Sequence, residues 1–139
     1  MKYLIVGLGN VGRTLAEQLT DMGHDVIGVD TNENRVDEIK DRISIAYILD
    51  ASQVDALSEL PLDEVDTAIV SIGQSMDQSL RAVAALKELK VARIYARALD
   101  NVHHAILRAM SISCIFTPET YAARLFAQKF TEDIKDDLI

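Results

Sequence analysis

Three glycines near the start of the chain have the spacing of a phosphate-binding turn. Gly7, Gly9 and Gly12 follow an apolar run and precede residues with helical periodicity, which indicates a strand, a tight turn and a helix. In such a turn the first glycine permits the sharp bend, the second lets the backbone approach a pyrophosphate, and the third lets the helix lie close to the strand. The helix N-terminus then directs unpaired N–H groups at the phosphates. Because glycines are also common in purely structural turns, the motif needs support from the rest of the chain.

A carboxylate follows the glycine turn at the sequence separation that is typical of dinucleotide-binding folds. Asp30 closes the second predicted strand, roughly 20 residues after Gly12, where dinucleotide-binding folds place the acidic residue that accepts the ribose hydroxyls. A carboxylate at this point repels a 2′-phosphate, so the pattern favours NAD over NADP. The alternative is that Asp30 only caps the following helix.

Further polar residues are expected at the same edge of the sheet, because nucleotides bind at the carboxyl ends of parallel strands. They are Asp50, Ala51 and Ser52 after the third predicted strand, and Ser71, Ile72 and Gly73 after the fourth. Either segment alone would be an ordinary loop. The arginines that could neutralise phosphate are Arg13, Arg35 and Arg97, although each would by itself be an ordinary solvated residue. Arg97 is the best placed, because it lies at the end of the fifth predicted strand.

Catalytic candidates are few. His103 and His104 are adjacent, so on a helix their side chains point about 100° apart and cannot ligate one metal ion together; we interpret them as surface or interface residues. Cys114, the single cysteine, lies in a predicted strand and is expected to be a small core residue. Tyr95 and Tyr121 have no lysine four residues later, and the sequence has neither a Walker lysine nor a Gly-x-Ser-x-Gly elbow. We therefore predict no catalytic residue and no metal site.

The scaffold for these residues is an alternation of strands and helices. Strands are predicted at 2–6, 24–30, 45–50, 67–72, 93–96 and 114–116. Helices are predicted from the glycine turn to Met22, at 32–41, in a short segment before Pro61, and at 78–89, 101–110 and 119–130. Strands that recur roughly every 20 to 25 residues with helices between them indicate an α/β fold built of βαβ units. We expect a Rossmann-like, doubly wound parallel sheet of six strands in the order 3-2-1-4-5-6, with helices on both faces.

Helical periodicity also predicts which side chains face the core. In the first helix they are Val11, Leu15, Leu19 and Met22, with Gly23 as the C-cap. In the later helices they are Val36 and Ile39, and then Leu80, Val83, Ala84 and Leu86.

Length and composition limit the classes of protein. The 139 residues, 49% of them hydrophobic, suffice for one nucleotide-binding domain, predicted at 1–130. A formal net charge of −8 argues against nucleic-acid binding, which needs clustered Lys and Arg. No apolar run approaches the roughly 20 residues that cross a bilayer, and the N-terminus lacks a signal-peptide pattern, so we expect no direct membrane insertion. Residues 131–139 form an acidic C-terminal extension, interpreted either as a helix extension that needs a partner or as a frayed terminus.

The combination of these motifs resembles the nucleotide-binding domain of Trk/Ktr-type potassium-uptake regulators, the KTN or RCK N-terminal domain. The resemblance rests on segments 3–12, 23–30, 50–52, 68–73 and 96–98, and on His103-His104 leading to Thr117-Pro118-Glu119. It spans essentially the whole chain. Each segment is common among Rossmann folds, whereas their combination with the Pro-Glu pair before the last helix is more specific.

The resemblance implies a function and a set of binding residues. Such domains form cytosolic dimers and rings, up to octameric, bind NAD(H), ATP or ADP, and pass a ligand-dependent rearrangement to a membrane channel or transporter. By resemblance, Gly7, Gly9 and Asn10 would contact phosphates, Asp30 the ribose, residues 50–52 the adenine side, and residues 71–73 with Arg97 the far end of the ligand, while Glu119 would lie at a dimer contact near the nucleotide. The full predicted set is Gly7, Leu8, Gly9, Asn10, Val11, Gly12, Asp30, Thr31, Asn32, Arg35, Asp50, Ala51, Ser52, Ser71, Ile72, Gly73, Arg97 and Glu119.

Two departures from the family pattern refine this expectation. Members that discriminate ATP from ADP often carry Arg where this chain has Asn10, and that cation would meet the terminal phosphate. We therefore expect NAD or NADH as the ligand, with ATP, ADP or AMP as the alternative. Members also usually continue into a smaller ligand-binding lobe, whereas this chain ends at Ile139.

The resulting hypothesis is a non-catalytic nucleotide sensor that regulates potassium transport. It would be cytoplasmic, peripheral to the inner membrane through a channel or transporter subunit, and assembled as a homodimer or ring. One alternative is a minimal NAD-dependent oxidoreductase that completes its site across a dimer interface, with His103 or Tyr121 as the acid. Another is a passive assembly module with a vestigial site.

Overall fold

Six parallel strands form one sheet in the order β3-β2-β1-β4-β5-β6 in the computed structural model, which describes residues 1–132. The strands are β1 (Lys2–Val6), β2 (Asp25–Asp30), β3 (Ile45–Ile48), β4 (Thr67–Val70), β5 (Ile94–Arg97) and β6 (Cys114–Phe116). In the centre of the sheet, Leu4 of β1 is aligned with Ile27 of β2 on one side and with Ala68 of β4 on the other. The predicted fold and strand order are confirmed.

Helices cover both faces of this sheet. They are α1 (Asn10–Asp21), α2 (Glu33–Ile39), α3 (Val54–Leu57), α4 (Met76–Glu88), α5 (Asn101–Ala109) and α6 (Pro118–Thr131), with a 3₁₀ turn, η1, at Leu62–Glu64. Side chains of α1 and α2 pack with Ile5 and Ile69 of the sheet, and those of α3, α4 and α5 pack with Leu4 and Val70. Neighbouring residues of one strand therefore enter opposite cores, as expected for a parallel sheet that is buried on both faces.

The ends of two helices match the predicted pattern only in part. At the C-terminus of α1, Gly23 has φ +91° and its N–H donates to Thr20 O, while His24 N–H donates to Leu19 O, which is a Schellman motif. Met22 immediately before it is exposed rather than packed on the core. Helix α4 begins at Met76 rather than at residue 78, because the Ser75 hydroxyl accepts a hydrogen bond from Gln78 N–H.

The predicted buried face of α4 was partly wrong. Val83 and Leu86 are buried as expected, whereas Ala84 is exposed and Leu80 is half-buried. The buried stripe instead includes Ser79, Ala82 and Ala85. Alanine and serine are small enough to occur on either face, so periodicity alone could not place them.

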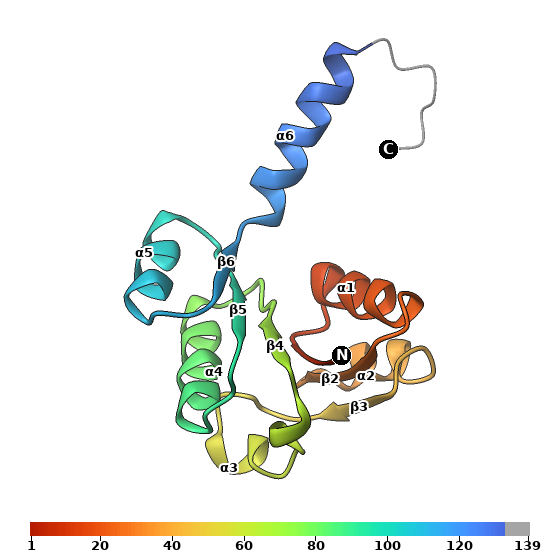
Figure 1. Ribbon diagram of the computed structural model, residues 1–139, viewed down its shortest axis with the longest axis vertical. Coiled ribbons are helices and arrows are strands. Elements are labelled where there is room, and N and C mark those ends of the chain that lie inside the picture. The colour runs from red at the N-terminus through yellow and green to blue at the C-terminus, as the bar shows by residue number, and fades with distance from the viewer. Residues whose placement is uncertain (133–139) are drawn as a thin grey trace.

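Helix α6 stands apart from the rest of the domain. It projects away from the sheet (Figure 1), and none of its residues is buried. Its large apolar side chains Tyr121, Leu125, Phe126 and Phe130 are exposed, and the rings of Phe126 and Phe130 are stacked. The predicted extension, 131–139, lies almost wholly outside the described residues. No helix within residues 1–132 is long and apolar enough to span a membrane.

Candidate functional site

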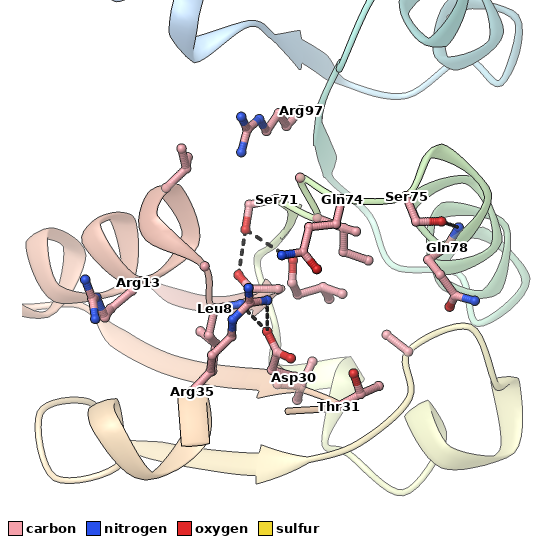
Figure 2. Close-up of a pocket in the computed structure, with 18 of the residues that line it drawn as sticks. Leu8, Arg13, Asp30, Thr31, Arg35, Ser71, Gln74, Ser75, Gln78 and Arg97 are labelled. Atoms are coloured by element: carbon pink, nitrogen blue, oxygen red, sulfur yellow. Dashed lines mark hydrogen bonds and ion pairs between the residues drawn. The ribbon is translucent and has the colours of Figure 1, made fainter. Parts of the chain in front are cut away.

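A cleft of about 730 Å³ opens at the carboxyl edge of the sheet. Its walls come from the ends of β1, β2, β4 and β5, the loop after β3, helix α2, and the first turns of α1, α4 and α6 (Figure 2). This volume lies within the range of ligand-binding clefts in proteins. All of the predicted binding residues line the cleft except Gly12 and Asn32.

Gly12 lies behind the cleft lining, where α1 packs against the glycine turn. A Cβ atom at this position would lie 1.8 Å from Gly7 O and 2.4 Å from the Ser71 hydroxyl, so only glycine allows α1 to approach the turn. Gly7 itself has φ +95°, a conformation that L side chains rarely adopt. Gly9 is open by contrast, since its nearest neighbour would be the Arg35 guanidinium carbon at 4.0 Å. The turn therefore has two structural glycines and one that faces open space.

The Asp30 carboxylate is fixed by main-chain donors. One oxygen accepts a hydrogen bond from Leu8 N–H at 2.7 Å and the other from Asn32 N–H at 2.8 Å. The side chain is only 7% exposed, and Arg35 Nη1 lies 3.7 Å from it. The residue that caps α2 is Asn32, whose side chain accepts from Asn34 and Arg35 N–H. Asp30 thus ties the end of β2 to the glycine turn rather than serving as the helix cap.

The predicted loops after β3 and β4 are also fixed by hydrogen bonds within the protein. The Ser71 hydroxyl, at the end of β4, donates to Gly7 O at 2.7 Å. The Asp50 carboxylate accepts from both the N–H and the hydroxyl of Ser52. These side chains therefore stabilise the cleft walls, and Asp50 keeps free acceptor capacity on its carboxylate.

The opposite end of the cleft is formed by Arg97 and Glu119. Arg97 Nη2 donates to the Glu119 carboxylate, which belongs to the first turn of α6. Arg97 Nε is buried without a hydrogen-bond partner, and it is the only such side-chain atom in the described part of the chain. A buried unpaired donor typically costs about 1–3 kcal/mol. Figure 2 shows Arg97 across the cleft from Asp30 and Arg35.

The sequence that forms this cleft matches a known protein family. The TrkA-N domain profile matches residues 3–118 of the chain. The chain belongs to the TrkA-N domain family. The resemblance to KTN and RCK N-terminal domains is thereby confirmed.

Relatives of this TrkA-N domain include potassium-uptake proteins. The Ktr system potassium uptake protein A of Bacillus subtilis is 29% identical over 132 residues, which are 95% of this chain and 60% of the relative. The protein of the same name from Vibrio alginolyticus is 30% identical over 118 residues, which are 85% of this chain and 54% of the relative. The chain thus spans little more than half the length of these relatives.

Solved structures share the fold of this TrkA-N domain. The TrkA-N domain of the inner membrane protein ybaL from Escherichia coli has a TM-score of 0.80 at 23% identity, covering 94% of this chain and 96% of that one. The GsuK channel bound to NAD has a TM-score of 0.72 at 17% identity, covering 82% of this chain and 21% of that one. The Kef C-terminal domain of Shewanella denitrificans in its AMP-bound form has a TM-score of 0.75 at 18% identity, covering 96% and 84%.

Sequence reasoning missed one wall of the cleft in this TrkA-N domain. Gln74, Ser75 and Gln78 line it from the loop after β4 and the start of α4, and Glu38 of α2 lies at another part of its lining. A signal was present, because Ser75 followed three residues later by Gln78 has the spacing of a capping box. With that pattern, α4 would have been predicted to begin at residue 76, and its first turn would have been predicted to line the cleft.

His103 is not the surface or interface residue that we predicted from the sequence. Its side chain is 0% exposed, and Leu99 N–H donates to its Nδ1 at 3.0 Å while its Nε2 lies 3.1 Å from the Ser79 hydroxyl. Because Nδ1 must accept, the neutral ring carries its proton on Nε2 and donates to Ser79. Burial lowers the pKa of His103 below its ordinary value, against the opposing charge of Asp100.

Cys114 also differs from its prediction. It was expected in the core, whereas its side chain is exposed because β6 is an edge strand with only β5 beside it. Neither Cys114 nor His103 nor Tyr121 lines the cleft. Within residues 1–132, no group of three His, Cys, Asp or Glu side chains is placed to hold a metal ion.

Proposed function

We propose that this TrkA-N domain is a non-catalytic sensor of adenine nucleotides that regulates potassium transport by a membrane channel or transporter. The observation that carries the proposal is the contact between Asp30 and Leu8 N–H. It fixes the carboxylate that would hold a ribose beside the turn that would hold the phosphates. Asp30 lines the same cleft as the N-terminus of α1, and its carboxylate has acceptor capacity beyond these two hydrogen bonds.

NAD or NADH is the proposed ligand, with ATP, ADP or AMP as the alternative. The cleft continues beyond the glycine turn to Arg97, which leaves room for a second nucleotide half. Asn10 at the start of α1 provides no cation for a terminal phosphate. Two proteins of the same fold have been solved with NAD and with AMP, which supports a nucleotide in this cleft.

The proposed partner is a potassium channel or transporter subunit in the membrane. Support comes from the names of the relatives, which are potassium-uptake proteins. We propose that residues 1–130 act as one nucleotide-binding domain, that two copies form a dimer or part of a ring, and that the assembly is cytoplasmic, at the inner membrane. A ligand can shift such an assembly only if it binds one arrangement more tightly than another, and a few kcal/mol suffice.

The oxidoreductase alternative gains no support from the positions of its proposed acids. His103 is fully buried and hydrogen-bonded to Ser79 of α4 and to Leu99 before α5. Tyr121 lies on the projecting helix α6 outside the cleft lining.

Calorimetric titration with NAD, NADH, NADPH, ATP, ADP and AMP tests the proposal. Wild-type protein should bind NAD or NADH, and should bind NADPH more weakly because Asp30 repels the 2′-phosphate. Asp30→Ala should lower the affinity about 10- to 100-fold, because the ribose hydroxyls would lose their hydrogen bonds to a charged carboxylate. Asp25→Ala, at the exposed start of the same strand, is the matched control and should bind normally.

Two results would contradict the sensor. Absence of binding to every nucleotide would favour the passive assembly module. Hydride exchange between NADH and small carbonyl substrates would favour the enzyme.

A further inference from the structure

The ion pair between Arg97 and Glu119 connects the cleft to α6. Arg97 ends β5 and its side chain is only 16% exposed, whereas the Glu119 side chain is 66% exposed. Within residues 1–132 this is the one ion pair or side-chain hydrogen bond between α6 and the rest of the domain. Since α6 also buries no residue, the exposed Glu119 carboxylate is the one polar side-chain contact between the described part of this helix and the cleft.

The guanidinium of Arg97 lies close to the loop after β4. Its Nη1 lies against Gly73, where a Cβ atom would approach to 2.7 Å, so the glycine makes room for it. Its Nε is buried and unpaired, and Arg97 as a residue lines the cleft. The other two arginines of the lining, Arg13 and Arg35, belong to α1 and α2. Arg97 is therefore the cation at the far end, with donor capacity that Glu119 leaves unused.

A phosphate group would satisfy this guanidinium better than Glu119 does. The fork of an arginine can donate two parallel hydrogen bonds to phosphate oxygens, and the unpaired Nε–H is one donor of that fork. Glu119 accepts from Nη2 alone. Once released, its carboxylate would regain water readily, because it is mostly exposed, and it would remain favourably placed in the first turn of α6, near the positive end of the helix dipole.

We propose that Glu119 is an internal counter-anion that the second phosphate of a ligand, the β-phosphate of ADP or the nicotinamide-side phosphate of NAD, must replace on Arg97. Occupation of the far end then frees the first turn of α6, so Glu119 both selects ligands by their length and couples the cleft to the helix. AMP, whose single phosphate belongs at the glycine turn, leaves the pair intact. This inference rests on the proposed nucleotide function and assigns a regulatory contact within the same site.

Titrations of Glu119→Gln with AMP, ADP and NAD test the competition. The variant keeps the side-chain size and removes the charge, so ADP and NAD should bind about two- to fivefold more tightly, as expected for loss of one exposed ion pair. AMP should bind as it does to wild type. Glu88→Gln, at the exposed C-terminus of α4, controls for net charge and should change none of the three affinities. Arg97→Gln should abolish the preference for ADP and NAD over AMP.

A distance measurement tests the release of α6 directly. Spin labels on Cys114, which is exposed at the start of β6, and on Gln128→Cys in α6 report the position of the helix relative to the sheet. The labelled protein is diluted with unlabelled protein so that distances within one chain dominate. NAD should shift or broaden the distance distribution and AMP should not, while Glu119→Gln should show the change without ligand.

The outcomes separate this inference from the function on which it rests. Wild-type protein that binds no nucleotide would overturn both. Wild-type protein that binds NAD while Glu119→Gln binds ADP and NAD no more tightly, or leaves the label distance unchanged, would overturn the counter-anion role alone.

Discussion

The Asp30 end of the cleft is held by main-chain contacts, whereas the Arg97 end is held by one side-chain ion pair. Asp30 accepts hydrogen bonds from Leu8 and Asn32 N–H, and Ser71 donates to Gly7 O. The first of these hydrogen bonds is buried and the other two are partly buried. At the other end, Arg97 has one exposed carboxylate partner and an unpaired Nε–H.

This contrast suggests different roles for the two ends of the cleft, one in holding the ligand and one in responding to it. A buried hydrogen bond cannot be broken without leaving an unsatisfied group, which makes the Asp30 end stiff. An exposed ion pair contributes less than about 1 kcal/mol and is readily exchanged for water or another anion. The stiff end is therefore suited to hold a common part of many ligands, and the exchangeable end is suited to distinguish among them.

Substitution of the buried glycine should have the largest effect on the stiff end. Gly12→Ala would place a methyl group within 1.8 Å of Gly7 O, so α1 or the turn must shift. The free energy of unfolding should fall by about 1–3 kcal/mol or more, as for other overpacked sites. Denaturant unfolding followed by circular dichroism measures this change.

Gly9→Ala is the matched control for Gly12→Ala. Its methyl group would have one neighbour, the Arg35 guanidinium carbon at 4.0 Å, and the cost should stay within about 1 kcal/mol, the loss of a favourable N-cap residue. Equal costs for the two variants would show that the turn is not as tightly packed against α1 as the structure indicates.

Sequence reasoning located residues of both ends of the cleft but not the contact that joins Arg97 to Glu119. The glycine turn and Asp30 are specified by local spacing and by strand ends, and the structure places them in one cleft; their contacts with a ligand remain predictions. The Arg97–Glu119 pair was not predicted, because it depends on how the projecting helix α6 leaves β6. The burial of His103 escaped prediction for a similar reason, since its partners come from α4 and from the turn before α5.

The pH dependence of stability should reveal His103, which supports the segment after Arg97. Burial lowers its pKa, so the unfolded chain binds the proton more readily than the folded one, and stability is lost as the pH falls through the ordinary pKa of histidine. Between about pH 7 and pH 5 this residue should contribute a loss of up to about 1.4 kcal/mol per pH unit. Urea unfolding at several pH values measures the slope.

Replacement of the titrating ring gives the control for this slope. His103→Asn keeps an acceptor for Leu99 N–H and should be less stable at pH 7, yet should show a flatter dependence between pH 7 and pH 5. His104→Asn, on the adjacent residue with a partly exposed side chain, should retain the wild-type slope. A wild-type slope in His103→Asn would assign the acid sensitivity to other groups.

The smallest effect should come from the surface ion pairs that join α1 to the α2 region. Arg42 Nη1 lies 2.7 Å from Glu17 of α1, so Arg42→Gln should lower the unfolding free energy by about 0.2–1 kcal/mol at low salt, with the difference largely screened at about 1 M NaCl. Arg81→Gln, which removes the pair with Asp77 inside α4, is the control for an ion pair that joins no separate elements. If Arg42→Gln cost as much as Gly12→Ala, the stiffness of the Asp30 end would derive from exchangeable side-chain charges, and the two ends of the cleft would no longer differ in kind.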